Sequence, residues 1–304
     1  MKRRGDPLDG FLVLDKPVGP SSTQALGRAR RAMGAAKAGH CGTLDPLASG
    51  VLVIAFGEAT KLVDHVMDGA KRYAFEVAWG EERSTDDLEG EVVARSDLRP
   101  GREEILAALP AFIGTIEQVP PPYSAIKQDG VPAYRRARAG EDFALPARRV
   151  EVHALDLVEV ISPDRARFEV ACGKGTYVRA LGRDIARRLG TRGHLVALRR
   201  LAVGPFDASR GISLETLEAP GYKPRAHLLP VETALDDIPA LAVTGAEADA
   251  VRHGRAVQLP RAALQLSALP PGRVVAVLEA GTLVALARIE DGHARPLRVL
   301  NRNT

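Results

Sequence analysis

Short runs of apolar residues, either unbroken or alternating with polar positions, recur along the chain and predict β-strands. The run over 51–56 is entirely apolar, and the run over 72–79 alternates around Tyr73, Phe75 and Val77. The same patterns predict strands over 11–17, 51–56, 72–79, 150–160, 165–172 and 195–203, of which the fourth and fifth are expected to pair.

Apolar positions spaced three and four residues apart predict helices over 22–33, 102–111, 179–189 and 244–254. Ser22 is the expected N-cap of the first helix, and Gly34 is its expected stop. In the third helix, Leu181, Ile185 and Leu189 fall on one face and the arginines fall on the other. We therefore predict an amphipathic helix there.

The proline run at 119–123 is incompatible with a helix interior, and it starts a basic excursion that reaches Arg149. The pattern loosens again over 204–240, where several prolines occur. Beyond it, brief apolar runs predict strands over 274–279, 283–289 and 297–300.

The predicted fold class is α+β, with two domains. The expected division is a large domain over 1–240, with a mixed, mainly antiparallel sheet, flanking helices and an insertion over 119–149, followed by a small β-barrel-like module over 241–304.

The composition fits a folded protein, with 26% charged and 45% hydrophobic residues among 304. No apolar run is long enough to span a membrane, and the two cysteines have neither metal-ligand spacing nor a disulfide pattern, so a cytoplasmic protein is expected. The net charge is +4, and arginines cluster in five segments: 28–31, 135–138, 148–149, 183–192 and 199–200. These clusters could form one cationic surface for a polyanion or could simply be solvated faces.

The most informative segment is the glycine-rich loop over 39–50, which holds a single carboxylate, Asp45. Pro46 disfavours the helical region for Asp45, and Gly42 and Gly50 permit tight turning or close approach of another molecule. An acid in such a setting is either a structural hydrogen-bond acceptor or a group held ready for chemistry. The loop alone does not decide between them.

Three separated motifs resemble those of the TruB family of bacterial tRNA pseudouridine-55 synthases. They are Gly-His-Cys-Gly-Thr-Leu-Asp-Pro-Leu-Ala-Ser-Gly at 39–50 with Gly-Glu-Ala-Thr-Lys at 57–61, Lys-Arg-Tyr at 71–73 with Asp86, Asp87 and Gly90, and Gly-Lys-Gly-Thr-Tyr-Val-Arg at 173–179 with Leu-Arg-Arg-Leu at 198–201. Lys-Pro-Val-Gly at 16–19 resembles the family's opening motif, 119–140 its RNA-gripping insertion, and the segment from Ala242 the PUA module that follows the catalytic domain in many members.

The chain departs from the family pattern at a few positions. Cys41 and Ser21 stand where the family commonly has threonine, and Arg83-Ser84 replaces Thr-Asp in the second motif. We expect Cys41 to be tolerated as a small neighbour of the acid, whereas the exchange at 83–84 puts the packing of that loop in question. None of these changes removes a group that the chemistry requires.

The resemblance implies that the chain isomerises a uridine by detaching, rotating and rejoining its base through carbon. Asp45 would be the nucleophile, and Arg179 would keep it ionised and oriented. Tyr73 would stack on the target base and take part in proton transfer. Without the motifs, Arg179 would be read as a surface residue at a helix start and Tyr73 as a core residue of a strand.

The resemblance assigns further residues to substrate binding. Tyr177 and Leu198 match positions that line the base pocket, although either could be plain core. His40 would contact the RNA where the target nucleotide has left the stack, and the ordinary alternative is a loop hydrogen-bonder. Lys16 is expected to support the active-site loop rather than to perform chemistry.

The expected partner is tRNA, contacted at the T-arm and the acceptor end. The T-loop uridine would be everted into the site, which costs least in a loop. No cofactor, metal, membrane or protein partner is expected, and a monomer suits a large RNA.

Two alternatives stay open: a non-catalytic RNA-binding or RNA-chaperone protein, and a synthase for ribosomal or other RNA. The residues also leave open whether Asp45 attacks the ribose C1′ or the uracil ring.

Overall fold

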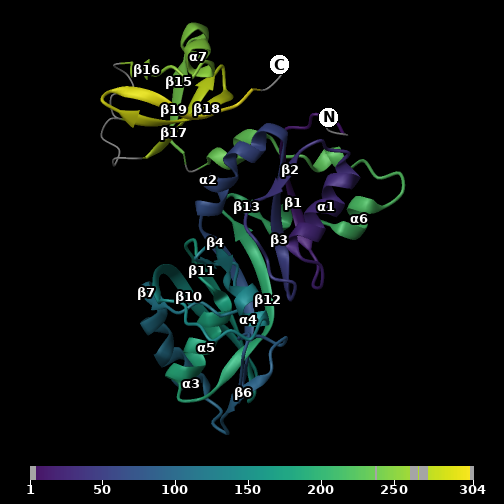
Figure 1. The fold of residues 1–304 in the computed structure, drawn as a ribbon, viewed down its shortest axis with the longest axis vertical. Helices are drawn as coiled ribbons and strands as arrows, with labels where there is room; N and C mark the ends of the chain where they lie inside the picture. The colour runs from purple at the N-terminus through teal and green to yellow at the C-terminus, as the bar shows by residue number, and fades with distance from the viewer. Residues whose placement is uncertain (1–4, 237, 261–265, 267–272, 302–304) are drawn as a thin grey trace.

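The computed structural model describes residues 5–236, 238–260, 266 and 273–301, and the remaining parts of the predicted 241–304 module lie outside them. Within the described chain, a ten-stranded mixed sheet forms the large unit (Figure 1). Its strands run in the order β14 (Ile212–Ser213), β1 (Gly10–Lys16), β3 (Ala48–Phe56), β12 (Gly193–Val203), β4 (Lys71–Trp79), β11 (Arg165–Cys172), β10 (Arg148–Ser162) and β7 (Gly114–Gln118), with β2 (Ala38–His40) beside β3 and β13 (Phe206–Asp207) beside β12.

The sheet is mainly antiparallel, as predicted, and its parallel pairs are β1 with β14 and β3 with β12. Every strand predicted for the large domain is present, and β10 pairs with β11. The apolar run before Phe56 begins earlier than predicted, because β3 starts at Ala48, where it pairs with Leu198 of β12. Strand β3 begins inside the first family-like motif, and β12 contains the Leu-Arg-Arg-Leu segment of the third. These two strands therefore lie side by side near the centre of the sheet.

Two short ribbons and several helices flank the sheet (Figure 1). The ribbons are β5 (Glu81–Arg83) with β6 (Val92–Arg95) and β8 (Lys127–Gln128) with β9 (Val131–Pro132). The α-helices of the described large unit are α1 (Ser22–Met33), α2 (Val63–Asp68), α3 (Arg102–Ala108), α4 (Ala133–Arg138), α5 (Val178–Arg188) and α6 (Leu214–Glu218). The 3₁₀ turns are η1 (Gly57–Leu62), η2 (Leu109–Phe112), η3 (Ala208–Arg210), η4 (Pro224–His227) and η5 (Val231–Leu235).

Helix α1 spans the predicted residues, but its N-cap is Ser21 and not Ser22. Ser21 has extended backbone angles, and its hydroxyl accepts from the Gln24 amide while the Gln24 side chain accepts from the Ser21 amide, which completes a capping box. Ser22 is buried, and its hydroxyl bonds Leu44 in the Asp45 loop instead. Sequence alone does not separate two adjacent serines, because both are good caps.

The loosened segment over 204–240 is not a free linker. Its β14 pairs with β1, Leu229 exchanges backbone hydrogen bonds with Phe11, and α6 packs against α1. Its prolines break regular elements without preventing burial, since Val231 and Ala234 are almost completely buried.

The C-terminal part forms its own curled five-stranded sheet (Figure 1). The order is β15 (Ala240–Val243), β17 (Val274–Glu279), β18 (Thr282–Glu290), β19 (His293–Val299) and β16 (Val257–Gln258), with α7 (Gly245–Arg252) packed against it. The predicted strands at 274–279 and 283–289 are present, whereas β19 starts earlier than predicted because Pro296 and the polar residues near it still pair with β18.

A shared apolar cluster joins this sheet to the large unit. Phe11 and Val53 belong to the same buried cluster as Leu283 and Leu286 of β18. Polar contacts border it: the Lys61 ammonium donates to the Val299 carbonyl (2.7 Å), and the Glu58 carboxylate accepts from the Asn301 amide (2.6 Å). Among the described residues, no helix is long and apolar enough to cross a membrane.

Candidate active site

A cavity of about 380 Å³ opens beside the loop that precedes β3. Its walls come from that loop, from β4 and β12, from the turn before α5 and from the insertion after β7. Of the residues singled out from the sequence, it brings together Asp45, Tyr73, Tyr177, Arg179 and Leu198. His40 and Lys16 are not among its lining residues.

The Asp45 loop is held by side chains from the preceding elements. The Lys16 ammonium, at the end of β1, donates to the carbonyls of Pro17 (2.8 Å) and Pro20 (2.9 Å) and more weakly to that of Pro46 (3.5 Å). The Ser22 hydroxyl accepts from the Leu44 amide (2.7 Å) and donates to the Leu44 carbonyl (2.8 Å). The residues on both sides of Asp45 are thus fixed by buried donors, which limits the positions open to its side chain.

Arg200 on β12 holds the same loop from the other side. It is 1% exposed, and its guanidinium donates to the carbonyls of Val51 (2.7 Å), Gly42 (3.2 Å) and Thr43 (3.3 Å). Gly50 makes this approach possible: its φ is +96°, and a Cβ there would lie 2.2 Å from the Arg200 carbonyl oxygen.

Because position 50 carries no side chain, β3 and β12 can pair closely next to the acid. Gly50 lies opposite Arg200 in this parallel pair, and the Arg200 side chain reaches the loop from there.

Asp45 meets Arg179, the second residue of α5. The Arg179 Nε lies 2.9 Å from the Asp45 Oδ2, and the Asp45 side chain is 36% exposed while that of Arg179 is 5% exposed. The Nε–H is not aligned on a hydrogen-bond acceptor, so the contact is an ion pair without a directed hydrogen bond. Because the Asp45 side chain is partly exposed and lines the cavity, part of the carboxylate stays accessible from the cavity.

The other nitrogens of Arg179 are engaged by two further segments. One donates to the Thr85 carbonyl (2.9 Å) and the buried Asp87 carboxylate (3.2 Å), and the other donates to the Tyr123 carbonyl in the insertion (2.8 Å). The guanidinium is thus fixed by the second motif and by the insertion before it reaches Asp45. The alternative of a surface arginine at a helix start does not hold, because Arg179 is buried.

Tyr73 lies on β4, two residues after Lys71, so both side chains face the cavity. Burial raises the pKa of the Tyr73 phenol, and the guanidinium of Arg200 beside it partly offsets this. The phenol is therefore protonated at neutral pH. Burial also lowers the pKa of Lys71, whose ammonium donates to the Met67 carbonyl.

Leu198 and Tyr177 form further parts of the wall. Leu198 and Arg200 share one face of β12 between two shifts of its register with β4, whereas Arg199 turns to the other face and pairs with Asp15 (2.9 Å). Tyr177 precedes α5, its amide donates to the Gln118 side chain (2.8 Å), and the Arg148 guanidinium lies 5.0 Å from its ring centroid.

His40 lies on β2, paired with Ile54 of β3 and half-buried. Its Nδ1 is buried and has no hydrogen-bond partner within the part of the chain that the structure describes. Burial, followed by the positive charge of Arg200, lowers the pKa of the His40 ring, so the imidazole is neutral at pH 7. Lys16 is fully buried, and burial lowers its pKa to about 8, which the nearby Asp45 carboxylate opposes and Arg200 reinforces.

The departures from the family pattern fit the structure. Cys41 is completely buried, and burial raises the pKa of its thiol to about 12, so it acts as a small apolar residue. Arg83 donates to the Gly90 carbonyl (3.2 Å) and pairs with Glu81 (3.1 Å), which closes the loop that the exchange at 83–84 had put in question.

The arginines of α5 do not all lie on a solvated face, because Arg179 and Arg183 are buried, whereas Arg187 and Arg188 are exposed. Arg183 is buried against Asp86 (2.8 Å), and Arg187 pairs with Glu82 (2.6 Å). Arg183 also donates to the Val119 carbonyl at the start of the insertion (2.9 Å). Periodicity could not show this, because the acids and carbonyls that cover these arginines come from distant segments.

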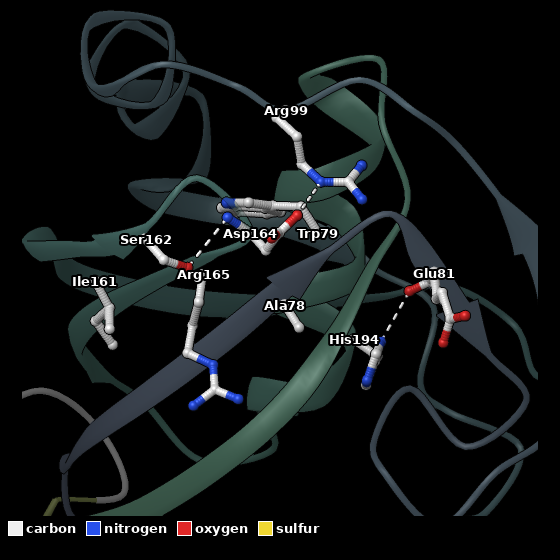
Figure 2. A pocket seen from close by; sticks show the side chains of 9 residues that line it. All are labelled: Ala78, Trp79, Glu81, Arg99, Ile161, Ser162, Asp164, Arg165 and His194. Atoms are coloured by element: carbon white, nitrogen blue, oxygen red, sulfur yellow. Dashed lines mark hydrogen bonds and ion pairs between the residues drawn. The ribbon is translucent and has the colours of Figure 1, made fainter.

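A second cavity, of about 470 Å³, lies at the other end of β4 and β12 (Figure 2). Several of its polar groups pair with one another: Arg99 pairs with Asp164 (2.5 Å), and the His194 Nδ1 lies 2.9 Å from the Glu81 carbonyl oxygen. Although it is larger, it contains none of the residues that the motifs single out. The cavity beside Asp45 is therefore the candidate site.

Sequence reasoning missed three contributors to this site: Arg200, which holds the loop, Asp87, which holds Arg179, and Ser124 of the insertion, which lines the cavity. Arg200 and Asp87 lie inside motifs that were recognised, so a signal existed for both. Ser124 had none, since it is a lone serine in a basic loop. No group of three or more His, Cys, Asp or Glu suited to a metal ion occurs among the described residues.

Comparison with known proteins agrees with these motifs. Residues 30–178 match the family model for the N-terminal domain of TruB family pseudouridylate synthases, and residues 179–236 match the model for the tRNA pseudouridylate synthase B C-terminal domain. A tRNA pseudouridine synthase B from Rhodospirillum rubrum is 52% identical, covering 99% of both chains. One from Bradyrhizobium diazoefficiens is 55% identical over 99% of this chain and 88% of its own.

Solved structures show the same fold. A chain in a Cbf5-Nop10-Gar1 complex superposes with a TM-score of 0.73 at 25% identity, covering 96% of this chain and 84% of its own. A chain in an H/ACA RNP bound to a substrate RNA containing 2′-deoxyuridine gives 0.74 at 22% identity, covering 99% and 91%. Both superpositions extend over the large sheet and the C-terminal module, and they confirm the predicted fold class.

Proposed function

The chain belongs to the TruB family of pseudouridylate synthases, and from this we propose that it converts the T-loop uridine of tRNA, position 55, to pseudouridine with Asp45 as the nucleophile. The reaction is an isomerisation in which the base leaves its ribose, turns and rejoins through carbon. The observation that carries the proposal is the partly exposed Asp45 carboxylate held 2.9 Å from a buried guanidinium at the wall of a cavity.

The roles follow from the environment of each group. The ion pair with Arg179 fixes the direction of the Asp45 carboxylate, which is proposed to act as the nucleophile. Tyr73 offers a ring face for stacking on the everted base, and because its phenol is protonated it enters proton transfer as the neutral form. Leu198 and Tyr177 supply further walls for the base, and the neutral His40 is proposed to contact the RNA beside the everted nucleotide.

Lys16 is proposed to act through the loop. Its ammonium is buried among backbone carbonyls and does not line the cavity, so it positions Asp45 without meeting the substrate.

The RNA contacts are proposed at three places. Arg148 and Lys174 line the cavity, and we propose that they contact phosphates of the T-arm. We assign residues 1–240 to the catalytic domain, the insertion over 119–149 to the grip on the stem, and the PUA-like module over 241–304 to the acceptor end. The proposal includes a monomer that works in the cytoplasm without a protein partner, a membrane or a cofactor.

The first prediction tests the nucleophile. An unmodified tRNA transcript incubated with the protein should acquire pseudouridine at the T-loop position, mapped by chemical probing. Asp45→Asn should lower the rate by at least about 10³-fold, because it keeps the size of the side chain but loses the nucleophilic charge. Tight tRNA binding should persist in a filter-binding assay.

Asp156→Asn is the matched control, since Asp156 is an exposed acid on β10, away from the cavity. It should react at the wild-type rate. No T-loop product from wild-type protein, with a known synthase active in the same tube, would favour the RNA-chaperone alternative. Full activity of Asp45→Asn, with deamidation excluded by mass spectrometry, would remove Asp45 from the mechanism.

A further inference from the structure

The insertion contributes to the cavity a hydroxyl that the protein leaves without a partner. Ser124 is 4% exposed and lines the cavity, and its Oγ is buried with no hydrogen-bond partner among the described residues. Leaving a buried polar group unsatisfied costs about 1–3 kcal/mol, and folded proteins retain few such groups. A buried, unpaired hydroxyl at the wall of a substrate cavity is a place for a substrate atom.

The backbone around Ser124 is fixed on both sides. The Tyr123 carbonyl accepts from Arg179 (2.8 Å), and the Ser124 carbonyl accepts from the Tyr134 amide of α4 (3.0 Å). The guanidinium that pairs with Asp45 therefore also holds the residue before Ser124. The insertion therefore positions the hydroxyl, and Arg179 links this position to that of Asp45.

Four other polar side chains in this wall are engaged by protein groups. Lys71 donates to the Met67 carbonyl, Arg148 to the Gly175 carbonyl (2.7 Å), and Thr176 to the Gly173 carbonyl (3.3 Å). Lys174 pairs with Asp68 (3.0 Å). The Arg148 Nε is also buried without a partner among the described residues, but its guanidinium is already bonded through another nitrogen, whereas the Ser124 hydroxyl makes no hydrogen bond within the described chain.

We propose that Ser124 reads the base: its hydroxyl donates a hydrogen bond to a carbonyl oxygen of the uracil ring when the everted uridine occupies the cavity. This inference rests on the proposed function and extends it to a specific contact. Uracil presents two carbonyl oxygens on its edge, and flipped bases are read by hydrogen bonds to that edge while their faces are stacked. Tyr73 and Leu198 supply such faces, and Ser124 supplies a donor.

The test combines a serine variant with single-atom changes in the substrate. tRNAs carrying uridine, 2-thiouridine or 4-thiouridine at the target position are assembled by ligation, and single-turnover rates are measured for each. Ser124→Ala should react roughly tenfold more slowly on uridine, as expected for the loss of one hydrogen bond in a desolvated site. Sulfur is a weak acceptor, so wild-type protein should be slowed by one of the two thio substrates.

The rates together separate a base contact from a structural role. Ser124→Ala should show no additional slowing on the thio substrate that affects the wild type, whereas Ser124→Thr, which keeps the hydroxyl, should still respond to it. Removal of an unpaired buried hydroxyl should leave the midpoint of thermal unfolding unchanged or higher. Ser209→Ala, at an exposed turn away from the cavity, is the control and should match the wild type throughout.

Two results would overturn the inference: a wild-type rate for Ser124→Ala on uridine, or equal thio effects in Ser124→Ala and wild type. Both leave the proposed function intact, because wild-type protein still forms pseudouridine. Absence of any product from wild-type protein would instead count against the function itself.

Discussion

Lys16 shows how a charged side chain can serve a site without touching it. Its ammonium is fully buried and donates to three proline carbonyls, two of them next to its own strand and one next to Asp45. Burial lowers its pKa to about 8 from 10.5. The folded protein therefore releases this proton at a lower pH than the unfolded chain does.

This difference predicts how stability depends on pH. Below about pH 8 both states hold the proton, so Lys16 contributes no pH dependence. Between about pH 8 and 10.5 only the unfolded chain holds it, so raising the pH stabilises the folded protein through this residue. The free energy of unfolding of wild type minus that of Lys16→Met, from urea titrations, should rise from pH 7.5 to pH 10.

Lys127→Met, which removes an exposed lysine, is the control for this measurement and is titrated at the same pH values. A flat difference for Lys16→Met would show that the folded protein does not lower the pKa of Lys16.

The residues that gather at the cavity could be predicted from the sequence where a motif names them, whereas their roles stay predictions. Asp45, Tyr73, Tyr177, Arg179 and Leu198 were predicted by resemblance, and they meet in one cavity. Arg200 lies inside a recognised motif, but its packing, like that of Ser124, depends on contacts between segments far apart in the chain. Such contacts leave no local signal, because a hydroxyl or a guanidinium reads the same whether it is exposed or buried.

At the scale of elements, the junction of α1 with the Asp45 loop assigns different tasks to neighbouring serines. Ser21 caps the helix, while the hydroxyl of Ser22 satisfies both backbone groups of Leu44. Capping is a local matter of helix stability, whereas the Ser22 bonds fix the residue before the acid. The two functions can be separated by substitution.

Ser21→Ala should cost about 1 kcal/mol of stability with turnover unchanged, since it removes one cap. Ser22→Ala should cost about 1–3 kcal/mol, because two buried backbone groups lose their partner, and it should also lower kcat. Urea unfolding and single-turnover kinetics on tRNA measure the two effects. Equal kcat for both variants would show that Ser22 has no part in positioning the loop.

The sequence predicted which segments form helices and strands. It did not predict the tertiary contacts of their side chains. The strands at 72–79 and 165–172 and the helix at 22–33 follow from apolar spacing alone. The arginines of α5 were placed on a polar face, yet Arg179 and Arg183 are buried under carbonyls and carboxylates from 85–87 and 119–123. A helix pattern gives the faces of a helix but not the tertiary partners that let charged groups lie inside.

At the scale of the whole molecule, one apolar cluster spans both sheets. It includes Val13 and Phe206 from the large sheet and Leu283 and Leu286 from β18. A shared core of this kind favours joint unfolding, because neither unit can separate without exposing apolar surface. The two units are therefore expected to melt together.

The single tryptophan makes this testable, since Trp79 lies at the end of β4 in the large unit. Leu286→Ala should cost about 2–5 kcal/mol and lower the midpoint seen by Trp79 fluorescence. Far-UV circular dichroism should give the same midpoint. A separate early transition in circular dichroism, with the fluorescence midpoint unmoved, would mean that the units unfold independently.

The β-rich C-terminal sheet could be predicted, because brief apolar runs recur beyond 274, and the described residues from Ala240 onward form a five-stranded sheet of their own. The domain boundary at 240 stays a prediction. The return of 204–240 onto β1 could not be predicted, since its prolines and short elements resemble a linker. Burial of that segment depends on contacts with β1 and α1, which lie far earlier in the chain.

The close pairing of β3 with β12 at Gly50 has an evolutionary consequence. Gly50 has a left-handed φ of +96°, and any added carbon would lie 2.2 Å from a backbone oxygen. Substitutions of Gly50 should therefore not be tolerated, whereas Cys41 can be replaced by residues of similar size. Descendants of this chain that keep the reaction should keep glycine there, even where most of their surface has diverged.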